Sequence, residues 1–354
     1  MLSRPLKHTQ LRTIIRSDIA SGKFKAGDRL PSENEMAVQY GVSRPTVREG
    51  IGALVQEGIL ERFQGKGTFV ASGNPEPRDI AFVLCGRDYT DPLFAMTLRG
   101  AEGRCQACGH RLVHSYCEKP EDLKSIEAWL RDHGPVRGLI VTGLLDLRWL
   151  MRFMDVQENL VLVGDVIGRE RTPDVVLRIV SNNGEAAEEA MDHLLGLGHR
   201  RIAHITGDLK RVWFREPYEA YAGKLKERGI PADKNLLVEC ADEGLDYGYQ
   251  ATQQLLRLPK RPTAIFASND RFAWGAIRAI REAQLRVPED ISVIGMNDLP
   301  LGDRRDFLTT MTLPQEQMGA IAVDRIIAGA AGITEQIVAP MVLTVRQSCA
   351  ALKA

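Results

Sequence analysis

A short stretch near the N-terminus carries hydroxyl and guanidinium side chains of the kinds that bind nucleic acid. It reads Val42-Ser43-Arg44-Pro45-Thr46-Val47-Arg48-Glu49. The Arg44 guanidinium can donate to the two acceptors that guanine presents in the major groove, so Arg44 is the favoured base-reading residue. Thr46 and Arg48 suit contacts with phosphate oxygens. This pattern predicts binding to double-stranded DNA.

The surrounding sequence predicts two short helices that would position these side chains. Pro31-Ser32-Glu33-Asn34-Glu35 contains a Ser-x-x-Glu capping box, a start signal for a helix that Gly41 ends. Ser43 can cap a second helix, whose apolar residues recur at the spacing of one buried face: Val47, Ile51, Leu54 and Val55. Two helices joined by a glycine turn predict a helix-turn-helix, in which the second helix enters the major groove.

After Gly58 the pattern becomes that of a β-hairpin. Residues 59–63 and 67–70 are expected to be strands, with Gln64-Gly65-Lys66 as the turn between them. Lys66 suits a phosphate contact, and Gly65 would let the backbone approach a groove. The hairpin predicts a wing, so residues 1–71 are expected to form a winged helix-turn-helix domain of the α+β class.

The stretch from Pro5 to Ala71 resembles the winged-helix domain of GntR-type transcription regulators. Three motifs carry the resemblance, at residues 27–33, 42–48 and 65–70. It implies DNA contacts on the second helix and at the wing tip, by Ser43, Arg44, Thr46, Arg48, Gln64, Gly65 and Lys66. Lys7 is expected to touch phosphate, and Asn34 occupies a contact position where many relatives have arginine. The plainer alternative is a basic, solvated surface on a domain that binds protein.

Residues 72–79 are polar and proline-bearing, and are expected to link this domain to a larger body. Within a chain of zero net charge, residues 1–72 hold 11 Lys and Arg against 7 Asp and Glu, which is typical of a basic DNA-binding head. Beyond the linker, apolar runs alternate with helical stretches, which predicts βαβ units and parallel sheets. The expected strands are 80–84, 138–141, 160–163, 201–205, 264–267 and 291–294, and the expected helices are 184–197, 216–228, 246–257 and 271–284.

The body, residues 80–354, resembles the effector domain of LacI-type repressors, which shares its fold with periplasmic sugar-binding proteins. Matching stretches lie at residues 193–203, 262–270, 287–295 and 308–310. The resemblance implies an α/β domain of two similar lobes around a cleft, joined by crossings near residues 164–180, 295–313 and 336–345. It also implies that this domain binds ligand and forms a dimer. A GntR-type head on a LacI-type sensor resembles the arabinose repressor subgroup, without implying arabinose as the ligand.

The same resemblance implies a set of ligand-binding side chains in the cleft: Asp91, Phe94, Asp165, Trp213, Arg215, Asn269 and Asn297. Arg215 falls on the family's ligand arginine, and its guanidinium could bind two hydroxyls or a carboxylate. Asp91 and Asp165 accept hydrogen bonds while ionised, which suits a sugar or sugar derivative as effector. Asp165 and Arg215 also have a plainer interpretation, as structural ion-pair residues.

Two positions depart from the pattern of sugar-responsive relatives. Asn297 stands where many have aspartate, and Glu243 stands where an aromatic side chain is often found. Tyr247, Trp213 or Phe94 could supply the missing apolar contact.

One cluster imitates a zinc site, since Cys105-x-x-Cys108 has His110, His114 and Cys117 nearby. Cys105 and Cys108 fall in an expected helix, where cysteine acts mainly as a small hydrophobe, so neither metal nor cofactor is expected. Catalysis is not expected either, because the sequence holds no glycine-rich phosphate loop and no nucleophile elbow. A cytoplasmic location is expected, because no apolar run approaches the ~18–20 residues of a membrane span and no signal-peptide core is present.

Together these interpretations predict a dimeric, ligand-controlled transcription regulator, expected to be a repressor that a sugar-like effector releases from its operator. Because linkage runs in either direction, a corepressor-dependent regulator is an open alternative. Another is a cytoplasmic sugar-binding protein with a vestigial DNA-binding head.

Overall fold

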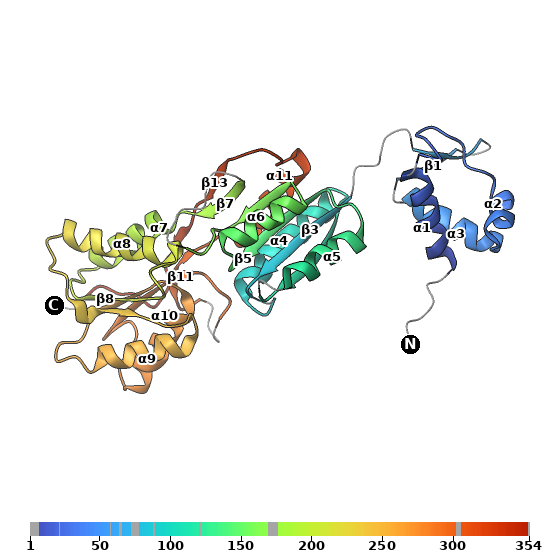
Figure 1. The fold of residues 1–354 in the computed structure, drawn as a ribbon. Coiled ribbons are helices and arrows are strands. Elements are labelled where there is room, and N and C mark those ends of the chain that lie inside the picture. The colour runs from blue at the N-terminus through green and yellow to red at the C-terminus, as the bar shows by residue number, and fades with distance from the viewer. Residues whose placement is uncertain are drawn as a thin grey trace. The chain divides into compact units, whose positions relative to one another are not determined.

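The computed structural model describes residues 7–352, apart from 21, 57, 64–65, 72–77, 88, 120–121, 169–175 and 302–305. The chain divides into two compact units, Met1–Arg78 and Asp79–Ala354 (Figure 1). Most of the expected linker, at residues 72–77, lies outside the described residues. The fold class expected from the sequence is confirmed, with a helix-turn-helix unit followed by an α/β unit.

The first unit holds three helices and a hairpin: α1 (Lys7–Ala20), α2 (Glu33–Tyr40), α3 (Arg44–Gln56), β1 (Leu60–Phe63) and β2 (Gly67–Val70). The capping box is present at the start of α2, where the Glu35 amide donates to Ser32 Oγ over 3.3 Å and the Ser32 amide donates to Glu35 Oε2 over 2.7 Å. Gly41 ends this helix with a φ of 62°, a conformation that glycine adopts without strain. The antiparallel hairpin closes over a core that includes Leu11, Ile15, Met36, Val47, Ile51 and Leu54.

The first lobe of the second unit is built on an entirely parallel sheet in the order β13-β7-β6-β5-β3-β4. Its strands are β3 (Asp79–Cys85), β4 (Arg111–Cys117), β5 (Gly138–Gly143), β6 (Leu160–Val163), β7 (Leu177–Ser181) and β13 (Gln336–Ala339). Helices α5 (Leu123–His133) and α6 (Leu147–Val156) cover one face, and α4 (Pro92–Ala107) and α11 (Gln315–Ala328) cover the other.

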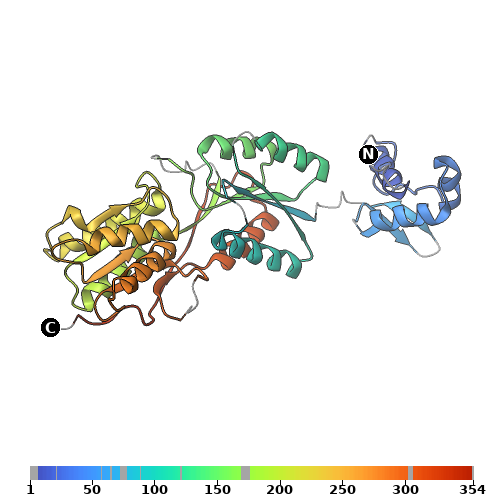
Figure 2. The same ribbon diagram turned by 90° about the horizontal axis from the view of Figure 1, so that it is seen from below.

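The second lobe repeats this plan around a sheet in the order β14-β12-β11-β10-β8-β9, in which only β14 runs antiparallel to its neighbour. Its strands are β8 (Ile202–Thr206), β9 (Leu237–Glu239), β10 (Ala264–Ala267), β11 (Ser292–Asn297), β12 (Thr309–Thr312) and β14 (Val342–Thr344). Helices α7 (Asn183–Gly196) and α8 (Val212–Glu227) cover one face, and α9 (Leu245–Leu256) and α10 (Asp270–Glu282) cover the other (Figure 2).

The chain passes between the lobes three times. It enters the second lobe between β7 and α7, returns between β12 and α11, and crosses again between β13 and β14. The first of these crossings lies slightly later than expected, because β7 still belongs to the first sheet. As a result, only short segments connect the lobes. Helix α11, near the end of the sequence, packs on helix α4, which lies more than 200 residues before it (Figures 1 and 2).

Glycines let α4 and α11 approach closely. A Cβ added at Gly319 would lie 2.1 Å from the Thr97 carbonyl oxygen, and one added at Gly100 would lie 1.9 Å from the Glu316 carbonyl oxygen. Neither backbone can yield locally, because both segments are helical. This contact ties the segment that returns from the second lobe to the helix that begins beside the cavity described below.

Gly319→Ala should therefore destabilise the second unit, despite the better helix propensity of alanine. Overpacking at such a contact lowers the free energy of unfolding by about 1–3 kcal/mol. Gly103→Ala is the matched control, because a Cβ there meets no atom within 4 Å and should raise stability by up to about 1 kcal/mol. Urea denaturation followed by circular dichroism measures both. Equal effects of the two substitutions would contradict the close approach.

Candidate functional site

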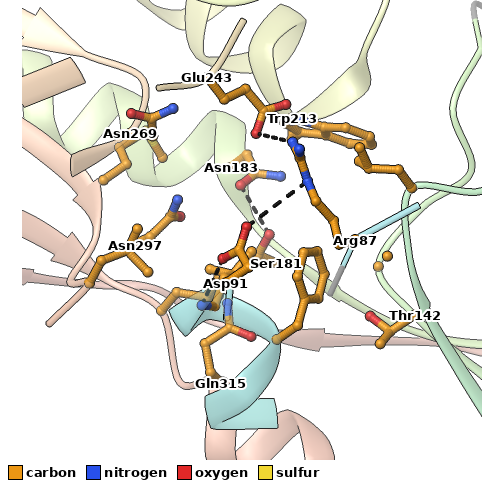
Figure 3. A pocket seen from close by; sticks show the side chains of 18 of the residues that line it. Arg87, Asp91, Thr142, Ser181, Asn183, Trp213, Glu243, Asn269, Asn297 and Gln315 are labelled. Carbon is orange, nitrogen blue, oxygen red and sulfur yellow. Dashed lines mark hydrogen bonds and ion pairs between the residues drawn. The ribbon is translucent and has the colours of Figure 1, made fainter. Parts of the chain in front are cut away.

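A cavity with a volume of about 150 Å³ lies between the two lobes of the second unit. The first lobe lines it with residues at or just after the ends of β3, β5, β6 and β7, and the second with residues at or after the ends of β8 to β12. Parallel sheets bind ligands at the carboxyl ends of their strands, and both sheets present those ends here. Figure 3 shows polar side chains from both lobes around the same space.

Six of the seven cleft residues expected from the sequence line this cavity: Asp91, Phe94, Asp165, Trp213, Asn269 and Asn297. Arg215 does not. Its Nε lies 3.9 Å from Glu219 Oε1, one turn further along α8. Trp213 and Phe214 face the cavity from the start of that helix, and a residue advances by about 100° around an α-helix, so Arg215 points elsewhere. Its expected role in ligand binding therefore stays a prediction, one that the lining of this cavity does not support.

The aromatic side chains that line the cavity are Phe94, Trp213 and Phe214; the first two were named as candidates, whereas the third candidate, Tyr247, is absent from the lining. Tyr247 packs instead beside the core of the second lobe, next to Gly244. The indole of Trp213 also has the Arg211 guanidinium 5.9 Å from its ring centre. The two aromatic candidates that line the cavity therefore come from different lobes, Phe94 from the first and Trp213 from the second.

Asp91 and Asn269 each cap a helix at the edge of the cavity. Asp91 Oδ1 accepts from the Leu93 amide over 3.1 Å at the start of α4, and Asn269 Oδ1 accepts from the Phe272 amide over 2.7 Å at the start of α10. Because the amide oxygen of Asn269 is engaged, its NH₂ group is the part that can donate to a ligand. Asn297 ends β11 with a φ of 101°, a left-handed conformation that asparagine tolerates better than most residues.

Asp165 was expected either to bind ligand or to form a structural ion pair, and its position is compatible with both. It lines the cavity, and its Oδ1 lies 2.8 Å from Nη1 of the buried Arg178. Arg178 also donates to Gln336 Oε1 on β13 over 2.9 Å, so this ion pair ties β6, β7 and β13 together at the cavity edge. A ligand hydroxyl that reaches Asp165 would meet a carboxylate whose charge is already balanced.

Three arginines beside the cavity were missed by sequence reasoning. They form an alternating series with two carboxylates, Arg211–Glu243–Arg87–Asp91–Arg271, which we call the arginine–carboxylate chain. Arg87 and Asp91 belong to the first lobe and the other three to the second, so the chain joins the lobes twice. Figure 3 shows the part formed by Glu243, Arg87 and Asp91. The only sequence signal was Glu243, which stands in place of an aromatic residue.

Directly behind Asn269, the carboxyl group of Asp270 is completely buried at the start of α10. It accepts from the Thr310 hydroxyl over 2.7 Å and from the Leu299 amide over 2.6 Å. Burial disfavours its ionised form and raises the pKa of Asp270 to about 7, although these two donors oppose the rise. Nearby, Arg346 holds Asp298 in a two-point contact of 2.7 and 2.9 Å.

On the first unit, the N-terminal turn of α3 presents the expected DNA-facing side chains. Arg44 is exposed, and Ser43 Oγ lies 2.7 Å from Thr46 Oγ1. Arg48 is also exposed, with its Nη2 3.0 Å from Glu33 Oε2, and this hydrogen bond holds the pKa of Glu33 below its usual value. Arg62 of β1, which sequence reasoning missed, lies 3.0 Å from the other oxygen of Glu33.

The remaining expected DNA contacts are less fully described. Asn34 is exposed on α2, and Lys66 is exposed at the end of the hairpin turn. Gln64 and Gly65 lie outside the described residues, as does the side chain of Lys7, whose backbone begins α1.

Within the described residues, no group of three or more His, Cys, Asp or Glu side chains is arranged to hold a metal ion. Of the cysteine pair that imitated a zinc site, Cys105 is buried in α4 and Cys108 is exposed just after it. Among the same residues, no helix is both long enough and apolar enough to span a bilayer.

Comparison with known proteins covers both units. The family of bacterial regulatory proteins of the gntR type matches residues 7–70, and the periplasmic binding protein-like domain matches residues 191–349. The chain is 30% identical to the arabinose metabolism transcriptional repressor of Geobacillus stearothermophilus, over 91% of this chain and 90% of that one. It is 30% identical to the ribose operon repressor of Escherichia coli K12, over 67% and 72%.

Among solved structures, the complex of the transcriptional regulator CelR with cellobiose is similar in fold. It superimposes with a TM-score of 0.66 at 23% identity and covers 90% of this chain and 100% of that one.

The buried Asp270 should give the protein a measurable dependence of stability on pH. Because its pKa in the folded state lies above the ordinary 3.8, the folded protein keeps a proton that the unfolded chain releases between about pH 4 and pH 7. The contribution of Asp270 to stability is thus present below pH 4 and is lost as the pH rises through 7. Asp270→Asn removes this titration. Denaturation curves of the two proteins should therefore differ by an amount that changes across this interval and is constant above it; a constant difference throughout would contradict the assignment.

Proposed function

The chain belongs to the family of bacterial regulators that join a gntR-type DNA-binding domain to a periplasmic-binding-protein-like domain, and we propose that it is a repressor released from its operator by a sugar-like effector. The observation that carries this proposal is that one chain holds both an exposed first turn of α3 and a cavity, lined by polar and apolar side chains, between two lobes. Such a protein acts by binding rather than by catalysis, and it acts in the cytoplasm, where its operator lies.

The DNA half of the proposal rests on α3 and the hairpin. Arg44 extends from the first turn of α3 with its guanidinium exposed, so it can reach the two acceptors of a guanine. Ser43, Thr46 and Arg48 would contact the phosphates of the same groove, and Asn34, Lys7 and the turn 64–66 those on either side. Glu33 would help to orient this surface, because it holds Arg48 and Arg62 together.

The effector half rests on the cavity. Asp91 and Asp165 would accept from ligand hydroxyls, Asn269 and Asn297 would donate or accept, and Phe94 and Trp213 would cover apolar faces of a sugar ring. Two relatives are named for arabinose and ribose, and one similar structure holds cellobiose, which supports a sugar or sugar derivative as the ligand class.

We further propose that the protein works as a homodimer. The two DNA-binding units of a dimer must bind two half-sites at a fixed spacing. A small rearrangement of the effector domains that changes the distance between these units would therefore weaken the DNA contacts of both. The short segments between the lobes, after β7, β12 and β13, would carry lobe closure to the rest of the domain. The effector then needs only a higher affinity for one arrangement of the lobes than for the other.

Binding of the full chain to DNA fragments, including the region upstream of its own gene, tests the proposal directly. Fluorescence anisotropy at moderate salt should detect one sequence-selective fragment, and a panel of pentoses, hexoses and sugar acids should contain a compound that weakens that binding. A compound that strengthens it would indicate a corepressor. Sugar binding without any selective DNA binding would support the sugar-binding protein with a vestigial head and would contradict a repressor.

Arg44→Ala should weaken operator binding by about 1–3 kcal/mol and relax the preference at one base pair, because a two-point contact with guanine is lost. Lys66→Ala is the comparison: loss of a phosphate contact should weaken binding to all sequences alike and lower the salt slope by about one. Competition titrations against single-base variants of the operator measure both. An unchanged base preference in Arg44→Ala would contradict the placement of α3 in the major groove.

A further inference from the structure

Within the arginine–carboxylate chain, Arg87 is the second partner of both carboxylates. Asp91 Oδ1 lies 2.9 Å from Arg271 Nη2, whereas Asp91 Oδ2 lies 4.0 Å from Arg87 Nε. Glu243 makes its shorter contact with Arg211 and lies 3.2 Å from Arg87 Nη2. Each carboxylate therefore keeps a close arginine of the second lobe if Arg87 turns to another partner.

Among the described residues, the charged side chains of the cavity lining and their ion-pair partners leave one positive charge in excess. The arginine–carboxylate chain holds three guanidinium groups and two carboxylates. The other charged residue of the cavity lining, Asp165, is balanced by Arg178 and does not change this excess. Because Arg87 has the longest contacts in the chain, it is the guanidinium that supplies the excess.

Arg87 is also within reach of a ligand. It lines the cavity and, together with Asp91, Glu243 and Arg271, it lines an adjoining outer pocket of about 560 Å³. The other charged residues of that outer pocket, Glu118, Lys119 and Asp242, are exposed, so solvent screens their charges. The side chain of Arg87 is 27% exposed, which leaves its guanidinium partly desolvated and accessible from both spaces.

We propose that Arg87 is the anion-binding residue of the effector cleft, and that the effector is a small hydroxylated molecule bearing a carboxylate or a phosphate group. This inference rests on the proposed function and names its ligand class. An arginine binds either group through two parallel charge-assisted hydrogen bonds, whereas the hydroxyls of a neutral sugar can accept two bonds but bring no negative charge to balance the guanidinium. The exchange leaves neither of these partly buried carboxylates unpaired, since Glu243 retains Arg211 and Asp91 retains Arg271.

The position of Glu243 agrees with this assignment. A carboxylate there provides Arg87 with an internal partner of the same chemistry as the ligand group. Glu243, whose contact with Arg87 is one of the two ion pairs by which the arginine–carboxylate chain joins the lobes, is thus a partner that an anionic effector can replace.

Isothermal titration calorimetry of the full chain with matched neutral and anionic compounds tests the inference. The pairs are galactose with galacturonate, glucose with glucuronate, and ribose with ribose 5-phosphate. In at least one pair the anionic member should bind tenfold or more tightly than the neutral one, equivalent to about 1.4 kcal/mol. Its affinity should also fall with added salt. The carboxylate and phosphate pairs separate the two forms of the anionic group.

Two variants identify the residue responsible. Arg87→Gln should reduce affinity for the anionic compound at least tenfold and leave that for its neutral partner within twofold. Glu243→Gln should raise affinity for the anion, because it removes the internal competitor for Arg87, whereas damage to the fold would lower it. Arg99→Gln is the matched control, since Arg99 is an exposed arginine of the same lobe that pairs with Glu316 away from the cavity.

Tighter binding of the neutral members, failure of every anionic compound to bind, or an unchanged anion preference in Arg87→Gln would overturn the inference. The proposed function fails differently. If a neutral sugar binds and causes release of DNA, the proposed repressor function is supported and the anionic effector is contradicted. If an anion binds but no DNA fragment is bound selectively, the anionic ligand is supported and the repressor function is contradicted.

Discussion

The site depends on one constraint: the chain crosses three times between two sheets whose carboxyl ends face the same gap. Each parallel sheet places the residues that follow its strands at one edge, and the crossings hold these two edges opposite each other. Side chains separated by more than a hundred residues, such as Asp91 and Arg271, therefore meet across the cavity. The same strands connected in a different order would not bring these side chains together.

The packing of α4 against α11 keeps this arrangement in place. Helix α11 returns from the second lobe and lies against α4 through Gly100 and Gly319, where the two backbones come too close for any side chain. The buried hydrogen bond from Thr97 to Gln315, 2.7 Å long, lies at the same contact, and Gln315 also lines the cavity. The position of Asp91, which caps α4, is thus linked to the segment by which the lobes are joined.

Charge pairing is a further feature of the site and of the residues around it. Arg178 balances Asp165, Arg346 balances Asp298, and the arginine–carboxylate chain balances all but one of its own charges. Partly buried ions are costly unless they are paired, so an anionic ligand needs a positive group that can leave its present partner. Arg87 is the residue at which such an exchange leaves nothing unpaired.

Much of this protein was determined by local sequence signals, because caps and periodicity act over one or two helical turns. The capping box at Ser32 and six of the strands that alternate with helices were predicted and are present, and the fold class is confirmed. The roles of Asp91, Asn269 and Arg44 remain predictions. What only the tertiary structure decided is which arginine faces the cavity. The phase of α8 turns Arg215 away from it, and the crossings bring Arg87 to Glu243, a partner that no local pattern could identify.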